Sequence, residues 1–540
     1  MHRLLTQTDV LYYVAFESNP KDQPSIARLS RAFFQSTAPL IWRRVDGVHN
    51  LLALIPAIYI KMFEKYPKCV DHMEYRRAIP RNFTRFSLYA PFVKYLEIYG
   101  QDATGYKFSG WRELGQYAKV APLLPNLVQL TLTAYPIESQ QQLMWMRTFL
   151  APTTLGIQVF RPTVNNTPLM SMPAASNLLK HVSTVAPGVQ RLSLFIQHEE
   201  YYQSEGDADV IGFWEFSPLQ YYLGNLTALQ ELTCTEAALA PEVFSIIAQL
   251  PNLRVLNIYP IGRAYSVWAS LNRKCVPLNP FPALEHFSMR VALTGDVLTV
   301  LGCLAFPNLS SLRLGIGQRP NPDYAIDDQV WEYEIVELIA EGCPHLKELR
   351  IDFDETHSYR ELRNLLTPVG NGDTVKLMSK LPLETLYLSS ATLGKISRAR
   401  ADPPYTAQYL MAAWPQVTKI HMPHFVGDFK RLYEFSQLPN LQELTLNLDL
   451  DYWNLHYDEE ELENLNPGSS PLRVLGASYK TYISETLDDL IAPALLHFWP
   501  NLEQISLRLD PDDPDNDYSE ILADIEEVNG AIKSFREARC

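Results

Sequence analysis

The side chains that could hold a metal or act in catalysis are scattered along this 540-residue chain. His421 and His424 stand three residues apart in HMPH, but no third acid or cysteine follows to complete a metal site. The six cysteines lie at wide intervals and form no CxxC pair. Phosphate-binding glycine loops and nucleophile motifs are absent from the sequence. We therefore expect no metal, no cofactor and no catalytic activity.

A second candidate, for calcium, lies near the carboxyl end. Asp513, Asp515 and Asp517 occupy the first, third and fifth ligand positions of a calcium loop. Tyr518 stands where the sharp turn needs glycine, and Asp524 stands where a bidentate glutamate is preferred. We interpret the segment as an acidic linker that leads into a helix over about 518–537, which caps the end of the fold.

The composition excludes several classes of partner. Hydrophobic residues make up 47% of the chain, which excludes general disorder. No apolar run reaches the roughly 18 residues that a membrane-spanning helix needs, and the amino-terminal residues do not resemble a signal peptide. The formal charge is −15, without a basic tail or a basic helical face. We expect neither a membrane nor a nucleic acid as partner, and the cysteine usage favours a reducing compartment, the cytoplasm or the nucleus.

One phrase, L-x-x-L-x-L, returns along most of the chain and explains its organisation. Its last three positions alternate apolar and polar residues, which predicts a short, half-buried strand. Segments of helical period precede many copies, for example 241–250 and 296–304. About fourteen copies recur at intervals averaging roughly 31 residues, the scale of solenoid repeats. The copies begin at Phe92, Pro125, Ala151, Pro187, Thr227, Pro251, Pro282, Pro307, Pro344, Pro382, Pro415, Pro439, Pro471 and Pro500.

This alternation of strand and helix predicts the fold. One strand and one helix cannot bury their apolar faces alone, so neighbouring units must stack. The phrase resembles the strand half of the leucine-rich repeat, which implies an α/β horseshoe with parallel inner strands and outer helices. An all-helical HEAT or armadillo array is the alternative, but it does not need the strand-like alternation.

The fold leaves the polar positions between the leucines as the surface for function. An extended strand displays every second side chain on the same face, so these positions form a continuous surface across the sheet. The hypothesis is that Arg313, Arg350, Tyr387 and His421, on consecutive units, contact a partner. A solvated strand face without a role is the alternative.

The residues before the repeats form a different module. Residues 9–18, 24–36 and 38–45 predict three short helices separated by turn signals. We divide the chain into this helical module (1–48), a helical linker or cap (49–90), the repeats (91–510) and the acidic linker with the final helix (511–540). So small a helical module has too little core to be robust alone, which favours a partner.

The amino-terminal module resembles the F-box in the form that precedes repeats in basidiomycete fungal proteins. The resemblance is carried by Val10, Leu11, Val14, Phe16, Pro20, Asp22, Ile26, Ala27, Leu29, Ser30, Arg31, Leu40, Ile41 and Trp42. The family usually opens with a Leu-Pro pair, where this chain has TQTDV.

The resemblance implies a non-catalytic substrate receptor of a ubiquitin ligase. Its F-box would dock on a Skp-type adaptor, and through it on a cullin, while the repeats hold an unknown target protein. The residues expected at the adaptor are Val10, Leu11, Val14, Ile26, Leu29, Leu40 and Trp42. A repeat scaffold or inhibitor without a role in ubiquitin transfer is the competing hypothesis. An enzyme is the third possibility, and it would need a cluster of polar residues that the sequence alone does not display.

Overall fold

The computed structural model describes the chain in ranges: 7–56, 59–64, 83–99, 103–133, 139–160, 170, 172–196, 219–235, 241–259, 276–318, 330–353, 377–389, 411–450, 465–479, 481–483, 488–508 and 518–539. The aspartates of the expected calcium loop, at 513, 515 and 517, lie outside them. The chain is α/β with a large parallel sheet, compatible with a solenoid. It divides into two compact units, Met1–Val255 and Leu256–Cys540. Within the described ranges, no helix combines the length and apolarity needed to cross a bilayer.

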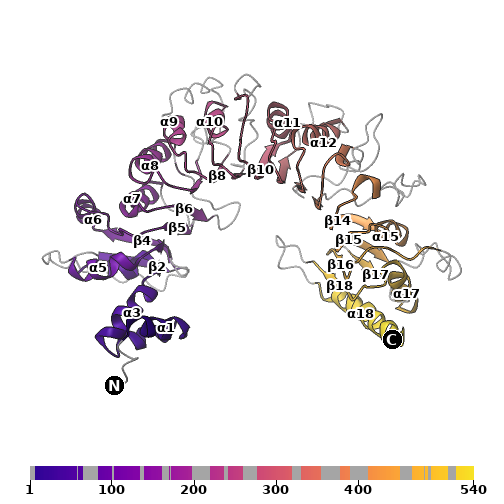
Figure 1. The fold of residues 1–540 in the computed structure, drawn as a ribbon, viewed down its shortest axis with the longest axis horizontal. Coiled ribbons are helices and arrows are strands. Elements are labelled where there is room, and N and C mark those ends of the chain that lie inside the picture. Colours follow the sequence, from indigo (N-terminus) through magenta and orange to yellow (C-terminus); the bar gives the residue numbers. More distant parts are fainter. Residues whose placement is uncertain are drawn as a thin grey trace. The chain divides into compact units, whose positions relative to one another are not determined.

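The first unit begins with helices and continues into strands that alternate with helices. Parallel pairing follows the order β1-β3-β5-β6-β7-β8, and helices α7, α8 and α9 lie along one face of these strands (Figure 1). A separate antiparallel ribbon joins β2 and β4. The elements are α1 (Thr8–Glu17), α2 (Gln23–Ala27), α3 (Arg31–Ile41), β1 (Arg44–Asp46), α4 (Val48–Leu52), β2 (Tyr59–Glu64), α5 (Thr84–Tyr89), the 3-10 turn η2 (Ala90–Phe92), β3 (Tyr95–Glu97), β4 (Ala103–Ser109), α6 (Trp111–Ala118), β5 (Gln129–Thr133), α7 (Ser139–Phe149), β6 (Gly156–Phe160), α8 (Met172–Val185), β7 (Arg191–Leu194), α9 (Leu219–Gly224), β8 (Glu231–Thr235) and α10 (Pro241–Ile247).

The second unit repeats the same alternation. Its strands pair in parallel in the order β10-β11-β12-β13-β14-β15-β16-β18, and β17 pairs with the end of β15. Strand β9 (Val255–Tyr259) lies at the division between the units. The further elements are β10 (His286–Leu293), α11 (Thr294–Cys303), β11 (Ser311–Gln318), α12 (Val330–Gly342), β12 (Glu348–Phe353), β13 (Thr385–Ser389), β14 (Lys419–Gly427), α15 (Phe429–Ser436), β15 (Glu443–Leu450), β16 (Val474–Ala477), β17 (Tyr482–Ile483), α17 (Asp488–Phe498), β18 (Gln504–Leu507) and α18 (Ser519–Arg539).

Every copy of the repeated phrase forms a strand, namely β3, β5 to β16 and β18, which confirms the strand prediction. The buried and outward positions alternate as the sequence indicates: Leu349 and Ile351 of β12 are fully buried, and Arg350 between them is part-exposed. The predicted helices also form, because Val243, Phe244 and Ile247 of α10 are buried on one face. An all-helical array is therefore wrong for this chain.

An asparagine before several strands ties one repeat to the next. In four of the five copies that read PNL, the asparagine Nδ2 donates to a backbone oxygen at the start of the preceding copy. The bonds are Asn126 to Pro91 at 2.7 Å, Asn252 to Thr227 at 2.9 Å, Asn308 to Pro282 at 2.7 Å and Asn440 to Pro415 at 2.9 Å. These asparagines stabilise the turns by hydrogen bonds to the backbone of the preceding copy. The repeat leucines face the core and make no such bonds.

The structure corrects the helix boundaries of the amino-terminal module. The helix predicted over 24–36 is broken, because the hydroxyl of Ser30 accepts a hydrogen bond from Phe33 N at 3.2 Å and starts α3 as its N-cap. Helix α3 then continues through Pro39 to Ile41, so residues 38–45 do not form a separate helix. Residues Arg44–Asp46 instead form β1, which pairs in parallel with β3.

The linker predicted to be helical contains a strand as well. Strand β2 pairs with β4, and aromatic rings pack beside this ribbon: the centroids of Tyr99 and Tyr106 lie 5.3 Å apart, and those of Trp111 and Trp145 lie 4.3 Å apart. Tyr106 of β4 is buried in this cluster, and aromatic residues favour strand over helix at such positions.

Helix α18 lies where the sequence predicts a final helix. Ile525, Val528 and Ile532 are buried at helical spacing, and Asn529 reaches the backbone of the last strand of the sheet. The Asn529 Oδ1 accepts from Ile505 N at 2.7 Å, and its Nδ2 donates to Ile505 O at 2.9 Å. The amide thus substitutes for the strand that would otherwise pair with this edge.

Candidate partner-binding surfaces

The four residues selected on consecutive repeats form one row across the second unit. The strand register aligns Arg313 with Arg350, Arg350 with Tyr387, and Tyr387 with His421. Adjacent positions in such a row are about 4.8 Å apart. Each residue occupies the same position in its repeat, so parallel pairing in register aligns all four. Arg313 and His421 thus lie in one row although more than a hundred residues separate them in the sequence.

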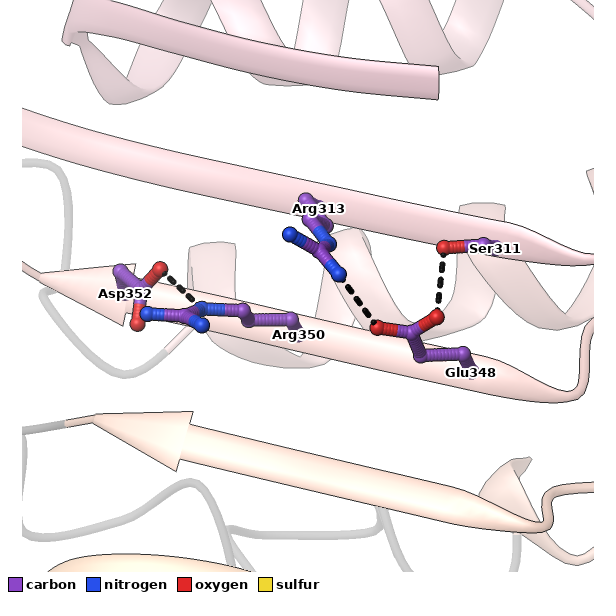
Figure 2. Close-up of polar contacts among 5 residues, drawn as sticks. All are labelled: Ser311, Arg313, Glu348, Arg350 and Asp352. Carbon is purple, nitrogen blue, oxygen red and sulfur yellow. Dashed lines mark hydrogen bonds and ion pairs between the residues drawn. The ribbon is translucent and has the colours of Figure 1, made fainter. Parts of the chain in front are cut away.

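Carboxylates on the same sheet face hold the two arginines, as Figure 2 shows. Arg313 Nη2 donates to Glu348 Oε1 at 3.0 Å, and the hydroxyl of Ser311 donates to Glu348 Oε2 at 2.9 Å. Arg350 Nε donates to Asp352 Oδ2 at 2.6 Å. Ser311 and Asp352 lie two positions from the arginines on their own strands, and Glu348 lies opposite Ser311. Pairs that water still reaches add little stability, but they orient the guanidinium groups.

Arg350 is also stacked on an aromatic ring. Its guanidinium carbon lies 3.9 Å from the centroid of the Tyr387 ring. Burial would lower the pKa of Arg350, but the hydrogen bond and charge of Asp352, together with Tyr387 and Glu348, outweigh it and raise the pKa. The side chain is therefore charged and restricted in its rotamers.

His421 ends the row, and its side chain is more buried than those of the two arginines. Its ring centroid lies 5.8 Å from that of Tyr387, and its Nε2 lies 3.8 Å from Glu443 Oε2. Burial lowers the pKa of His421, and the attraction of Glu443 offsets this only in part. Lys419 donates to Glu443 Oε1 at 2.7 Å and is the main cause of the lowered pKa of that carboxyl. His421 is thus neutral at pH 7, and the charge of Glu443 is balanced by Lys419.

A third arginine lies on β10, one outward position beyond this row. Arg290 pairs in register with Gly315, and a β-carbon placed on Gly315 would stand 2.7 Å from Arg290 Cγ. Because residue 315 is glycine, the methylene groups of Arg290 fit next to the backbone of β11, on the strand that carries Arg313. Arg290 is exposed and makes no hydrogen bond or ion pair to any residue of the described ranges.

A separate surface lies on the amino-terminal helices. Tyr13, Val14 and Phe16 of α1 are 68%, 46% and 56% exposed, and Leu29 after α2 is 69% exposed. A shallow apolar depression runs along α1, lined by Asp9, Val10, Tyr13, Val14 and Glu17. Apolar side chains exposed together on short helices are typical of a surface that a partner covers.

The seven residues expected at an adaptor are not equivalent in the structure. Val14 and Leu29 are exposed. Leu11 is fully buried in a module where α1 packs on α3, so its side chain offers no surface to a partner. Trp42 is half-buried and stacks on Tyr89 with centroids 4.6 Å apart. Val10, Ile26 and Leu40 are half-buried. Burial therefore divides the set into core residues and surface residues.

Several residues of both surfaces were missed in the sequence. Glu348 and Asp352 lie two positions from Arg350, and the period of a strand places such residues on the same face, so that signal was available. Tyr13 and Phe16 lie near Val10 and Val14 on α1, but sequence does not reveal that this face has no neighbour in the fold.

The geometry offers no site for a metal among the described residues, where no three acidic, histidine or cysteine side chains gather. Cys343 is buried, and burial raises the pKa of its thiol to about 12, which excludes it as a nucleophile at neutral pH.

No family model matches the chain, and no curated protein is similar to it in sequence.

Proposed function

We propose that the protein is the substrate-binding subunit of a ubiquitin ligase of the Skp-cullin-F-box type, built from an F-box and a leucine-rich-repeat solenoid. The observation that carries the proposal is the exposed apolar face of α1, with Tyr13, Val14 and Phe16 directed away from the core. A Skp-type adaptor would cover this face, and the row from Arg313 to His421 on the second unit would hold the target protein. The role is one of placement, because a receptor raises the local concentration of target lysines without reacting itself.

Point variants test adaptor binding better than a deletion of residues 1–48. Such a deletion would remove β1 and the start of α4, and so expose the edge of β3 in the first unit. Val14→Glu together with Leu29→Glu changes only exposed positions. Burying either carboxylate against an apolar partner is costly, so the double variant should lose the adaptor.

The experiment is co-purification of a recombinant basidiomycete Skp-type adaptor with the full chain. Wild type and the control Arg28→Glu, an exposed position of the same module, should retain the adaptor equally. The double variant should retain little of it, with an unchanged unfolding temperature. Equal recovery with the double variant, or no recovery with wild type, would refute the proposal.

One observation favours the competing function, a repeat scaffold without a role in ubiquitin transfer. The module is joined to the sheet by β1, and Leu11 and Ala38 are buried in it, as in a helical cap whose task is to cover the first repeat. A scaffold of this kind would bind its partner through the second unit and ignore the adaptor, so the same co-purification distinguishes the two functions.

A further inference from the structure

Three arginines lie on the outward sheet face of the second unit, at neighbouring register positions around Gly315, which has no side chain. Arg313 and Arg350 are register partners on β11 and β12, and Arg290 lies over Gly315 one outward position further along. Adjacent strands are about 4.8 Å apart and successive outward positions about 7 Å, so the three groups lie within reach of one short ligand segment.

The internal carboxylates leave hydrogen-bond donors unused. Glu348 occupies one terminal nitrogen of Arg313, and Asp352 occupies the Nε of Arg350, whose two terminal nitrogens make no hydrogen bond to described residues. Arg290 has no carboxylate partner in the described ranges. A guanidinium has five N–H donors, so each arginine keeps donors for an external acceptor.

The local charge is opposite to that of the whole chain. Three arginines against Glu348 and Asp352 give a local charge of 3 − 2 = +1, whereas the chain carries −15. The neighbouring His421 is neutral at pH 7 and Lys419 balances Glu443, so neither changes this sign. The cluster is therefore a locally positive place on a chain of negative net charge, which favours an acidic segment at this position.

We propose that the arginine cluster, defined as Arg290, Arg313 and Arg350, binds a peptide segment rich in glutamate or aspartate. Carboxylates match the planar fork of arginine and can accept two hydrogen bonds from it. The stacking of Arg350 on Tyr387 holds the guanidinium in place and so reduces the entropy that is lost on binding. Arginine and tyrosine are both enriched among the residues that contribute most to binding at interfaces. This inference rests on the proposed function, in which the second unit holds the target protein, and it gives the chemical class of the bound target segment.

Nucleic acid fits this surface less well than an acidic peptide. Glu348, Asp352 and Glu443 lie among the cations, and a continuous row of phosphates would be repelled by them. A peptide can place its carboxylates over the arginines alone and turn its other residues toward Tyr387.

The test is fluorescence anisotropy of a labelled polyglutamate peptide with the purified full chain. Wild type should bind, and Arg313→Ala with Arg350→Ala should weaken binding at least about tenfold, because the variant loses the charge-assisted hydrogen bonds to the peptide carboxylates. Glu348→Gln should strengthen binding, since it removes a competing charge and keeps the acceptor for Ser311. Arg350→Lys should weaken it, since it keeps the charge and loses the fork.

Controls separate this inference from loss of folding and from the proposed function. Arg473→Ala removes an exposed arginine that pairs with Glu503 at 3.5 Å on the same unit, and it should leave binding unchanged. The adaptor variant Val14→Glu with Leu29→Glu should also bind the peptide as wild type does. No binding by wild type, equal binding by the double arginine variant, or complete displacement by a single-stranded oligonucleotide of the same charge would overturn the inference.

Discussion

The contact between Asn529 and the last strand gives a prediction whose magnitude can be worked out. Asn529→Ala removes two neutral hydrogen bonds to the backbone of Ile505, each with a net contribution of about 1 kcal/mol. Alanine is the better helix former by about 0.6 kcal/mol, which offsets part of the loss. The expected net destabilisation of the α18 contact is about 1.4 kcal/mol, or about tenfold in the equilibrium for opening.

Hydrogen exchange measured at the amide of Ile505 is the suitable assay, because the end of a repeat array opens locally before the whole chain unfolds. Exchange of this amide should accelerate about tenfold in Asn529→Ala, while amides of the strands in the first unit remain unchanged. Asn529→Asp keeps the acceptor but loses the donor, so we expect it to accelerate exchange too. Lys533→Ala, an exposed position of the same helix, is the matched control. If Asn529→Ala exchanges no faster than this control, the amide does not cap the sheet edge and the reasoning is wrong.

Further predictions concern helix capping, the asparagine turns, the imidazole and a thiol. Ser30→Ala should destabilise α3 by about 1 kcal/mol through loss of the bond to Phe33 N, measured by urea unfolding, whereas Ser30→Asp should retain stability. Asn308→Ala should cost about 1 kcal/mol, and Asn308→Asp more, because a carboxylate would face the carbonyl that the amide now donates to; equal stability of the three proteins would contradict this. The lowered pKa of His421 means that the unfolded chain binds the proton more readily, so its contribution to stability falls as the pH drops through about 6.5. His421→Gln should therefore lose less thermal stability than wild type between pH 8 and pH 5.5. Cys343 should react with iodoacetamide only as fast as the unit opens, in step with added urea.

The site illustrates what a single sequence supports. The sequence was sufficient to select four residues that occupy the same place in their phrases: Arg313, Arg350, Tyr387 and His421. The register of β11 to β14 aligns them in one row, as equal positions in the repeat predict. Their partners were harder to find, because Glu348 pairs with an arginine of the neighbouring strand rather than of its own. A pattern within one strand does not say which side chain of the next strand a flexible guanidinium will choose.

The amino-terminal module illustrates the opposite case. Helical period was visible in residues 24–45, but the break at Ser30 and the change to strand at Arg44–Asp46 were not predicted. The first depends on a capping bond, and the second depends on the edge of β3, which lies some fifty residues away in the chain. Pairing with that edge satisfies the backbone of Arg44–Asp46, and a local propensity cannot override it.

By itself, the sequence determined the alternation of strand and helix, the parallel order of the strands and the identity of the core leucines. These follow from local period and repetition, which each unit carries in its own residues. Only the tertiary structure decided that Leu11 lies in the core while Val14 and Leu29 remain exposed, that Arg290 lies over Gly315, and that Asn529 closes the end of the sheet. These depend on which surfaces meet, and contacts between distant segments set burial and side-chain partners.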